Sequence, residues 1–352
     1  MESRRHFVVF FGFVALVAAL GFLLVRRAKA PASVLAVVPD DAWLVLTVDV
    51  GVLRSSGLAA SLASSGSAAG LGAIAGQCGF DPLARLRDIV VAAPEGGERG
   101  DFGIAFQADV SQVDLSTCAQ KVIAARGGKP EAKGSRAGFQ VLEDASDPGH
   151  ARLAYREGGP FLVGRGEWLD RMIDRAAADG RSAASPEPGR SPKDLAPGPA
   201  THQDLRLALA RAGTPTVLVT AVLPKDLRER LKAELGAELG SEADRSYAGV
   251  LSVEAAGLAM TTGPSGSTTS FDAELRCETP SACDTVKALL ERKRAAFVRN
   301  VAVRLVGLGP LLDSLHVDPR GGSLAVTASA PTDDLSKALA RALPFVVDSG
   351  AH

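Results

Sequence analysis

The chain has 352 residues, enough for about two or three domains. Its 39 Lys and Arg residues nearly balance its 40 Asp and Glu residues, which argues against a general nucleic-acid-binding protein. Apolar residues make up 46% and charged residues 22%, which excludes a wholly disordered chain. Aromatic residues make up only 5%, which argues against a carbohydrate-binding platform built on stacking rings.

The first feature along the chain is an uncharged apolar run at residues 7–25, FVVFFGFVALVAALGFLLV. As a helix rising 1.5 Å per residue it would extend about 28 Å, close to the thickness of a bilayer's hydrocarbon core. It has no polar face, unlike a surface helix of a globular domain. We therefore predict a transmembrane helix here.

This span could also belong to a cleaved signal peptide, because Ala28-Lys29-Ala30 resembles a cleavage site. Against cleavage, Arg26 and Arg27 separate the apolar run from that site, and Pro31 would follow the cut. The run is also longer than the apolar region of most signal peptides. We favour the interpretation that residues 1–30 form an uncleaved signal anchor. Positive charges flank both of its ends and do not decide its orientation.

In the first half of the remaining chain, apolar and β-branched runs predict strands and amphipathic runs predict helices. Strands are predicted at 43–50, 102–106 and 161–164, helices at 116–123 and 168–177, and a turn at Gly158-Gly159. The stretch 184–200, ASPEPGRSPKDLAPGPA, holds five prolines and cannot continue a helix or a central strand. We predict a linker at 184–204 between a first module, 31–183, and a second, 205–348.

The second module repeats this order of elements. Strands are predicted at 216–222, 271–275 and 324–327, helices at 226–236, 281–288 and 333–343, and a turn at Gly321-Gly322. The same order of elements in both modules favours an internal duplication. The alternative is a chance similarity, because strands and helices often alternate in proteins. Consecutive strands without a helix between them indicate antiparallel pairing. The predicted fold class is α+β: a transmembrane helix followed by two similar modules of antiparallel sheet and helices.

Four cysteines, Cys78, Cys118, Cys277 and Cys283, form an even set behind the predicted anchor, as in proteins of oxidising compartments. The short loop between Cys277 and Cys283 would let these two approach within bonding distance. A Cys78–Cys118 bridge would then keep each pair within one module. The alternative is four buried free thiols. Bridges would indicate that the bulk of the chain lies outside the cytoplasm.

No constellation for catalysis, cofactor binding or metal binding is present in the sequence. The histidines lack metal-binding spacing, there is no G-x-S-x-G elbow, and the glycine-rich stretches lack the spacing of nucleotide-binding loops. We therefore predict no catalytic, cofactor-binding or metal-binding residues. The cluster Glu291-Arg292-Lys293-Arg294, with Arg299 and Arg304, fits a solvated helix face better than a nucleic-acid patch.

The segment 38–49, VPDDAWLVLTVD, directly follows the anchor and resembles uncharacterised single-span envelope proteins of bacteria, including myxobacterial ones. In those proteins a similar strand opens a duplicated α+β ectodomain, and the resemblance implies no known active site. Our leading hypothesis is a non-enzymatic protein of the inner membrane with a periplasmic bulk. It would serve a structural role or bind an envelope partner, and it would use no cofactor.

Two alternatives remain at this point. One is an anchored hydrolase or transferase whose site assembles only in three dimensions, which a pocket holding His150 or His316 beside carboxylates would favour. The other is an anchored domain that faces the cytoplasm.

Overall fold

The computed structural model describes residues 34–56, 58, 74–94, 101–147, 149–182, 200–210, 213–238, 250–263, 266–300, 304 and 307–349. The predicted membrane span at 7–25 lies outside these residues, as does most of the predicted linker. None of the helices within the described ranges is long and apolar enough to cross a membrane.

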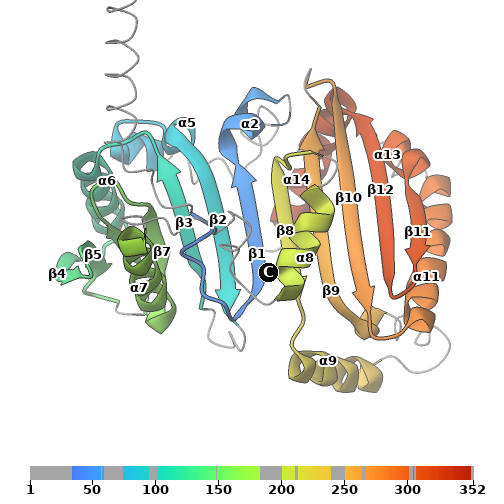
Figure 1. Cartoon of the computed structure of the whole chain (residues 1–352). Coiled ribbons are helices and arrows are strands. Elements are labelled where there is room, and N and C mark those ends of the chain that lie inside the picture. The colour runs from blue at the N-terminus through green and yellow to red at the C-terminus, as the bar shows by residue number, and fades with distance from the viewer. Residues whose placement is uncertain are drawn as a thin grey trace, which may run out of the picture.

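A single large antiparallel sheet organises the molecule (Figure 1). Its twelve strands lie in the order β11-β12-β10-β9-β8-β1-β2-β3-β7-β6-β5-β4. Every neighbouring pair is antiparallel. The prediction of an α+β protein with antiparallel pairing is therefore confirmed.

The first half of the sheet comes from residues before the predicted linker. Its strands are β1 (Ala42–Asp49), β2 (Leu86–Pro94), β3 (Gly103–Ala108), β4 (Pro130–Arg136), β5 (Phe139–Asp144), β6 (Arg152–Tyr155) and β7 (Phe161–Gly164). Its helices are α2 (Val50–Ser55), α5 (Pro82–Arg85), α6 (Gln112–Ala125) and α7 (Gly166–Ser182).

The second half follows the same general plan with fewer strands. Its strands are β8 (Val217–Val222), β9 (Val253–Thr262), β10 (Thr268–Cys277), β11 (His316–Arg320) and β12 (Ser323–Pro331). Its helices are α8 (Ala200–Leu209), α9 (Lys225–Glu238), the 3₁₀ turn η3 (Val250–Ser252), α11 (Pro280–Arg299), α13 (Gly309–Ser314) and α14 (Thr332–Ser349).

The halves join through their first strands, because β1 pairs with β8 at the centre of the sheet. The pairing runs from Leu44 opposite Ala221 to Val48 opposite Val217. The sheet is therefore continuous across the predicted boundary between the two modules.

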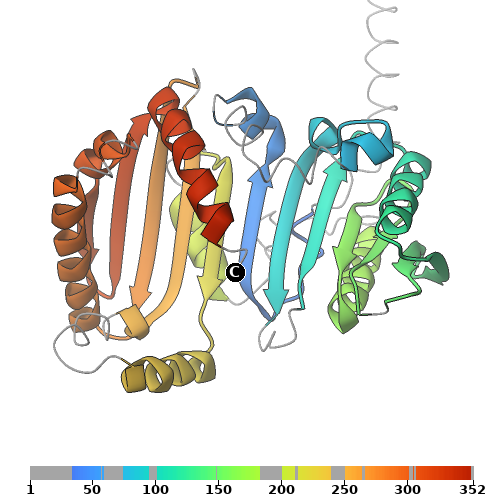
Figure 2. The ribbon, with the colours of Figure 1, turned by 180° about the vertical axis from the view of Figure 1, so that it is seen from behind.

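Helices cover both faces of this sheet. α7 and α8 lie on the face turned toward the viewer in Figure 1, and α6, α11 and α14 lie on the opposite face, seen in Figure 2. The main core lies beneath α7, whose apolar stripe repeats at helical spacing. That stripe consists of Trp168, Leu169, Met172, Ile173 and Ala176, all at most 2% exposed.

Both predicted disulfides are present. The Cα atoms lie 4.5 Å apart in Cys78–Cys118 and 5.6 Å apart in Cys277–Cys283. The first bridge ties the segment before β2 to α6, and the second ties the end of β10 to the first turn of α11. No free cysteine remains among the described residues.

A helix begins inside the predicted linker 184–204. α8 begins at Ala200, so residues 200–204 are helical, and residues 183–199 lie outside the described residues. The last proline of the stretch is Pro199, and nothing after it disfavours a helix. His202, Leu205 and Leu209 then follow at helical spacing and are all buried.

Candidate functional site

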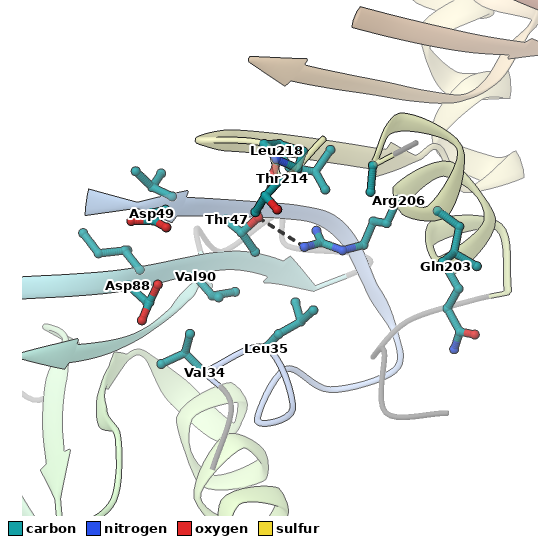
Figure 3. A pocket seen from close by; sticks show the side chains of 15 residues that line it. Val34, Leu35, Thr47, Asp49, Asp88, Val90, Gln203, Arg206, Thr214 and Leu218 are labelled. Atoms are coloured by element: carbon teal, nitrogen blue, oxygen red, sulfur yellow. Dashed lines mark hydrogen bonds between the residues drawn. The ribbon is translucent and has the colours of Figure 1, made fainter. Parts of the chain in front are cut away.

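A pocket of about 510 Å³ lies where the two halves of the sheet meet. Its floor is formed by side chains of three adjacent strands, with Leu218 on β8, Thr47 on β1 and Val90 on β2 in register with one another. One wall is α8, and the opposite wall is Val34 and Leu35, the first described residues of the chain (Figure 3). Most of the lining is apolar.

Arg206 on α8 places a cation in this apolar pocket. Its Nη2 donates a hydrogen bond of 3.1 Å to Thr47 Oγ1, and this bond crosses from α8 to β1 (Figure 3). Its Nη1 is buried and has no partner among the described residues. Burial lowers the pKa of Arg206 to about 10, so the group remains a cation at neutral pH. Buried polar groups are normally paired, and this donor is an exception to that rule.

Two carboxylates line the pocket away from Arg206. Asp49 ends β1 and stands directly opposite Asp88 on β2. Asp49 accepts a hydrogen bond of 2.8 Å from the Val52 amide and caps α2, so its position is fixed. The pKa of Asp88 is raised by burial and by repulsion from Asp49, and the neighbouring Arg87 opposes this. No ion pair joins Arg206 to either carboxylate in the described structure.

Two sets of contacts fix α8 on the sheet: the hydrogen bonds of His202, and the close packing of the helix against the backbone at Gly257 on β9. His202 Nε2 lies 2.9 Å from the Ala42 carbonyl oxygen, and Nδ1 lies 3.0 Å from Thr220 Oγ1. Because a carbonyl only accepts, Nε2 donates to Ala42 and Nδ1 of the neutral ring accepts from Thr220. Below α8, a Cβ at Gly257 would lie 2.5 Å from Leu209 Cδ1, so glycine there lets the helix lie close. These contacts hold Arg206 over the floor.

Because His202 is buried, we expect the folded protein to lose stability in acid. Burial lowers the pKa of His202 below the usual 6.5, with a further contribution from the Arg206 cation, despite the bond to Ala42. The unfolded chain therefore takes up a proton at a higher pH than the folded chain does. The resulting stabilisation is fully present above pH 6.5 and is lost as the pH falls below that value. We expect urea unfolding to show lower stability at pH 5 than at pH 7.

The variant His202→Gln keeps a donor and an acceptor but does not titrate, so its stability should change less between these two pH values. His316→Gln is the matched control, because His316 is exposed and should leave the pH dependence of the wild type intact. If the stability of the wild type and of His202→Gln depended equally on pH, the loss in acid would not come from His202.

The histidines singled out in the sequence lie elsewhere. His150 pairs with Asp147 at 2.6 Å on the surface, and His316 is exposed at the start of β11. Neither lines the central pocket or a second hollow of about 500 Å³ beside Arg87 and Arg156. The arrangement that would favour a hydrolase or transferase is thus not found at these two pockets. In the part of the chain that the structure describes, no three His, Cys, Asp or Glu residues cluster to hold a metal ion.

The predicted basic cluster lies on α11 and just beyond it, and most of its side chains are exposed, as expected for a solvated face. Arg294 is the exception. It donates to the carbonyl oxygens of Leu312 and Asp313 and so binds the end of α13.

Sequence reasoning missed the pocket residues. Arg206 interrupts an apolar run, Leu205-Arg206-Leu207-Ala208-Leu209, and this isolated charge is a signal that could have been noticed. Asp49 and Asp88 lie 39 positions apart and carry no local signature. Only the antiparallel register of β1 and β2 brings them together.

No family model matches the chain, and no curated protein matches it. Among solved structures, the chain is similar to crystal form IV of TP0453, with a TM-score of 0.46, 13% identity, and coverage of 89% of this chain and 99% of that one. Crystal form III of TP0453 gives a TM-score of 0.45, 12% identity, and coverage of 87% and 97%. Similarity at this level transfers no property to the present chain.

Proposed function

We propose that the chain is a non-enzymatic binding protein whose central pocket takes a small carboxylate with an apolar body. The observation that carries this proposal is the buried Nη1 of Arg206, an unpaired cationic donor in a predominantly apolar pocket. A carboxylate would accept from this donor and neutralise the charge, and an aliphatic tail would cover the apolar walls. The pocket supports a binding role for a small ligand, in place of the envelope partner that the sequence led us to expect.

The pocket would lie close to a membrane. Val34, which forms part of its wall, follows the end of the predicted span at Val25 by nine residues. An extended chain of that length reaches at most about 30 Å. We propose a single-pass protein of the inner membrane whose pocket faces the periplasm, and two disulfides support an oxidising compartment. A C-terminal alkaline phosphatase fusion should be active in cells, and an inactive but full-length fusion would place the pocket in the cytoplasm.

We also propose that the two halves arose by duplication. In each half a central strand is followed by a helix, β1 by α2 and β8 by α9, and the second half carries the additional helix α8 before β8. Each continues with two strands and a cysteine-bearing helix, α6 with Cys118 and α11 with Cys283, and these two helices lie on the same face of the sheet (Figure 2). The closing helices α7 and α14 differ, since they lie on opposite faces (Figures 1 and 2). The partner cysteines differ in position, since Cys78 precedes β2 and Cys277 ends β10. The pocket would then have formed at the seam between the copies.

The binding proposal is tested by titrating the full chain, held in lipid nanodiscs, with hexanoate and octanoate, using ligand-detected NMR and empty nanodiscs as the blank. We expect saturable 1:1 binding. Each buried methylene adds about 0.8 kcal/mol, so octanoate should bind roughly 15-fold more tightly than hexanoate. No saturable binding of either acid would contradict the proposal.

A further inference from the structure

The lining of the central pocket carries charge at two separate places, Arg206 and the pair Asp49 and Asp88. Two charged places narrow the chemical class of the ligand more than a single cation would. Thr47, which accepts from Arg206, and Asp49 are two residues apart on β1, so both side chains point to the same face. At the usual rise of a strand, these positions are about 7 Å apart. Figure 3 shows Arg206 near Thr47, with Asp49 and Asp88 further along the same strands.

The two carboxylates are unfavourable neighbours, and the nearby Arg87 cation, which pairs with Asp109, offsets their repulsion at Asp88 only in part. Asp49 and Asp88 stand directly opposite each other on paired strands, where like charges destabilise the sheet. Burial and this repulsion both disfavour the ionised form of Asp88 and raise its pKa. A cation bound between them would relieve the repulsion, just as an anion would pair with Arg206. The pocket therefore has an unpaired cationic donor on Arg206 and, further along its apolar floor, two like charges at Asp49 and Asp88, and a counter-ion would stabilise each place.

From this arrangement we propose that the ligand is a zwitterion with an apolar middle, whose carboxylate binds Arg206 and whose ammonium group binds Asp49 and Asp88. This inference rests on the proposed function, because both require a ligand whose carboxylate binds Arg206. It adds the second charge, which lies two residues along β1 from Thr47. The matching chemical class is an ω-amino acid or a short apolar peptide, whose two charged groups lie at opposite ends of an apolar body.

The test compares three probes of one length on the full chain in nanodiscs: hexanoate, 6-aminohexanoate and hexylamine. An ammonium group paired with two carboxylates should make 6-aminohexanoate bind at least about tenfold more tightly than hexanoate. The amine alone should bind more weakly than 6-aminohexanoate. Equal affinities for hexanoate and 6-aminohexanoate would overturn this inference but leave the proposed function standing. Failure of all three probes to saturate would overturn both.

Two variants locate the second charge. Asp88→Asn preserves the size of the side chain and removes its charge, so it should abolish the advantage of 6-aminohexanoate while hexanoate binds at least as tightly as before. Asp284→Asn, at an exposed site on α11 outside the pocket, is the matched control and should preserve that advantage. An advantage that persists in Asp88→Asn would overturn the assignment of the ammonium site.

The dipeptide Leu-Leu distinguishes the two sources of such a zwitterion. Tighter binding than that of 6-aminohexanoate, lost when the peptide's carboxylate is amidated, supports a peptide ligand. Weaker binding supports an ω-amino acid. If the amidated dipeptide binds as tightly as the free one, Arg206 is not recognising a carboxylate and the inference fails.

Discussion

Replacing Cys78 and Cys118 together by serine is expected to lower the free energy of unfolding by about 4 kcal/mol, the largest effect on stability that we predict. This bridge closes a loop with a sequence separation of 40, whereas the separation in Cys277–Cys283 is 6. A longer loop loses more entropy in the unfolded chain when it is closed. Replacing Cys277 and Cys283 should therefore cost less, about 2 kcal/mol. Urea unfolding of the oxidised proteins measures both.

The control is the same measurement in a reducing agent, which should destabilise the wild type and leave a variant lacking all four cysteines unchanged. Equal losses in the two double variants would contradict the loop-length explanation. Four free thiols found by mass spectrometry in protein isolated from an oxidising compartment would contradict the bridges themselves.

Arg206→Met is expected to stabilise the unliganded protein and to abolish its binding of hexanoate. Burial lowers the pKa of Arg206 to about 10, so the cation is less stable in the fold than in water. Methionine fills similar space without a charge or an unpaired donor, and we expect a gain of about 1–3 kcal/mol. Thr47 keeps its hydrogen bond to the Leu218 carbonyl oxygen, so the change leaves no new unpaired group.

The matched control is Arg206→Lys, which keeps the charge but has one nitrogen in place of the three of the guanidinium group. It should bind hexanoate more weakly than the wild type does and should be less stable than Arg206→Met. A residue that weakens the empty protein and strengthens its complex is typical of a binding site. If Arg206→Met instead lowers stability and leaves binding unchanged, Arg206 serves the fold and not a ligand.

Much of the fold was predictable because its signals are local. The apolar, β-branched runs at 43–50 and 216–222 predicted β1 and β8 to within one residue at every end. The pattern of 168–177 predicted a helix, and α7 lies there with Trp168 and Met172 in the core. The pairing of β1 with β8 was not predicted, since strand order depends on contacts between residues about 170 positions apart.

The site was not predictable for the same reason. Its walls come from the segment after the predicted anchor, from β1 and β2, and from α8. α8 itself was hidden by assigning residues up to 204 to the proline-rich linker. Arg206 differs from an ordinary surface arginine only in its surroundings, because its pocket and its unpaired Nη1 exist only in the folded chain.

The most direct test of the central proposal is to observe the arginine side chain itself. In ¹⁵N NMR spectra of the full chain, the side-chain signal that disappears in Arg206→Met identifies Arg206. Titration with hexanoate should shift this signal saturably, with the same dissociation constant as the ligand-detected titration, and should leave the signal of the exposed Arg299 in place. Saturable binding of hexanoate with no shift of the Arg206 signal would contradict the proposed site.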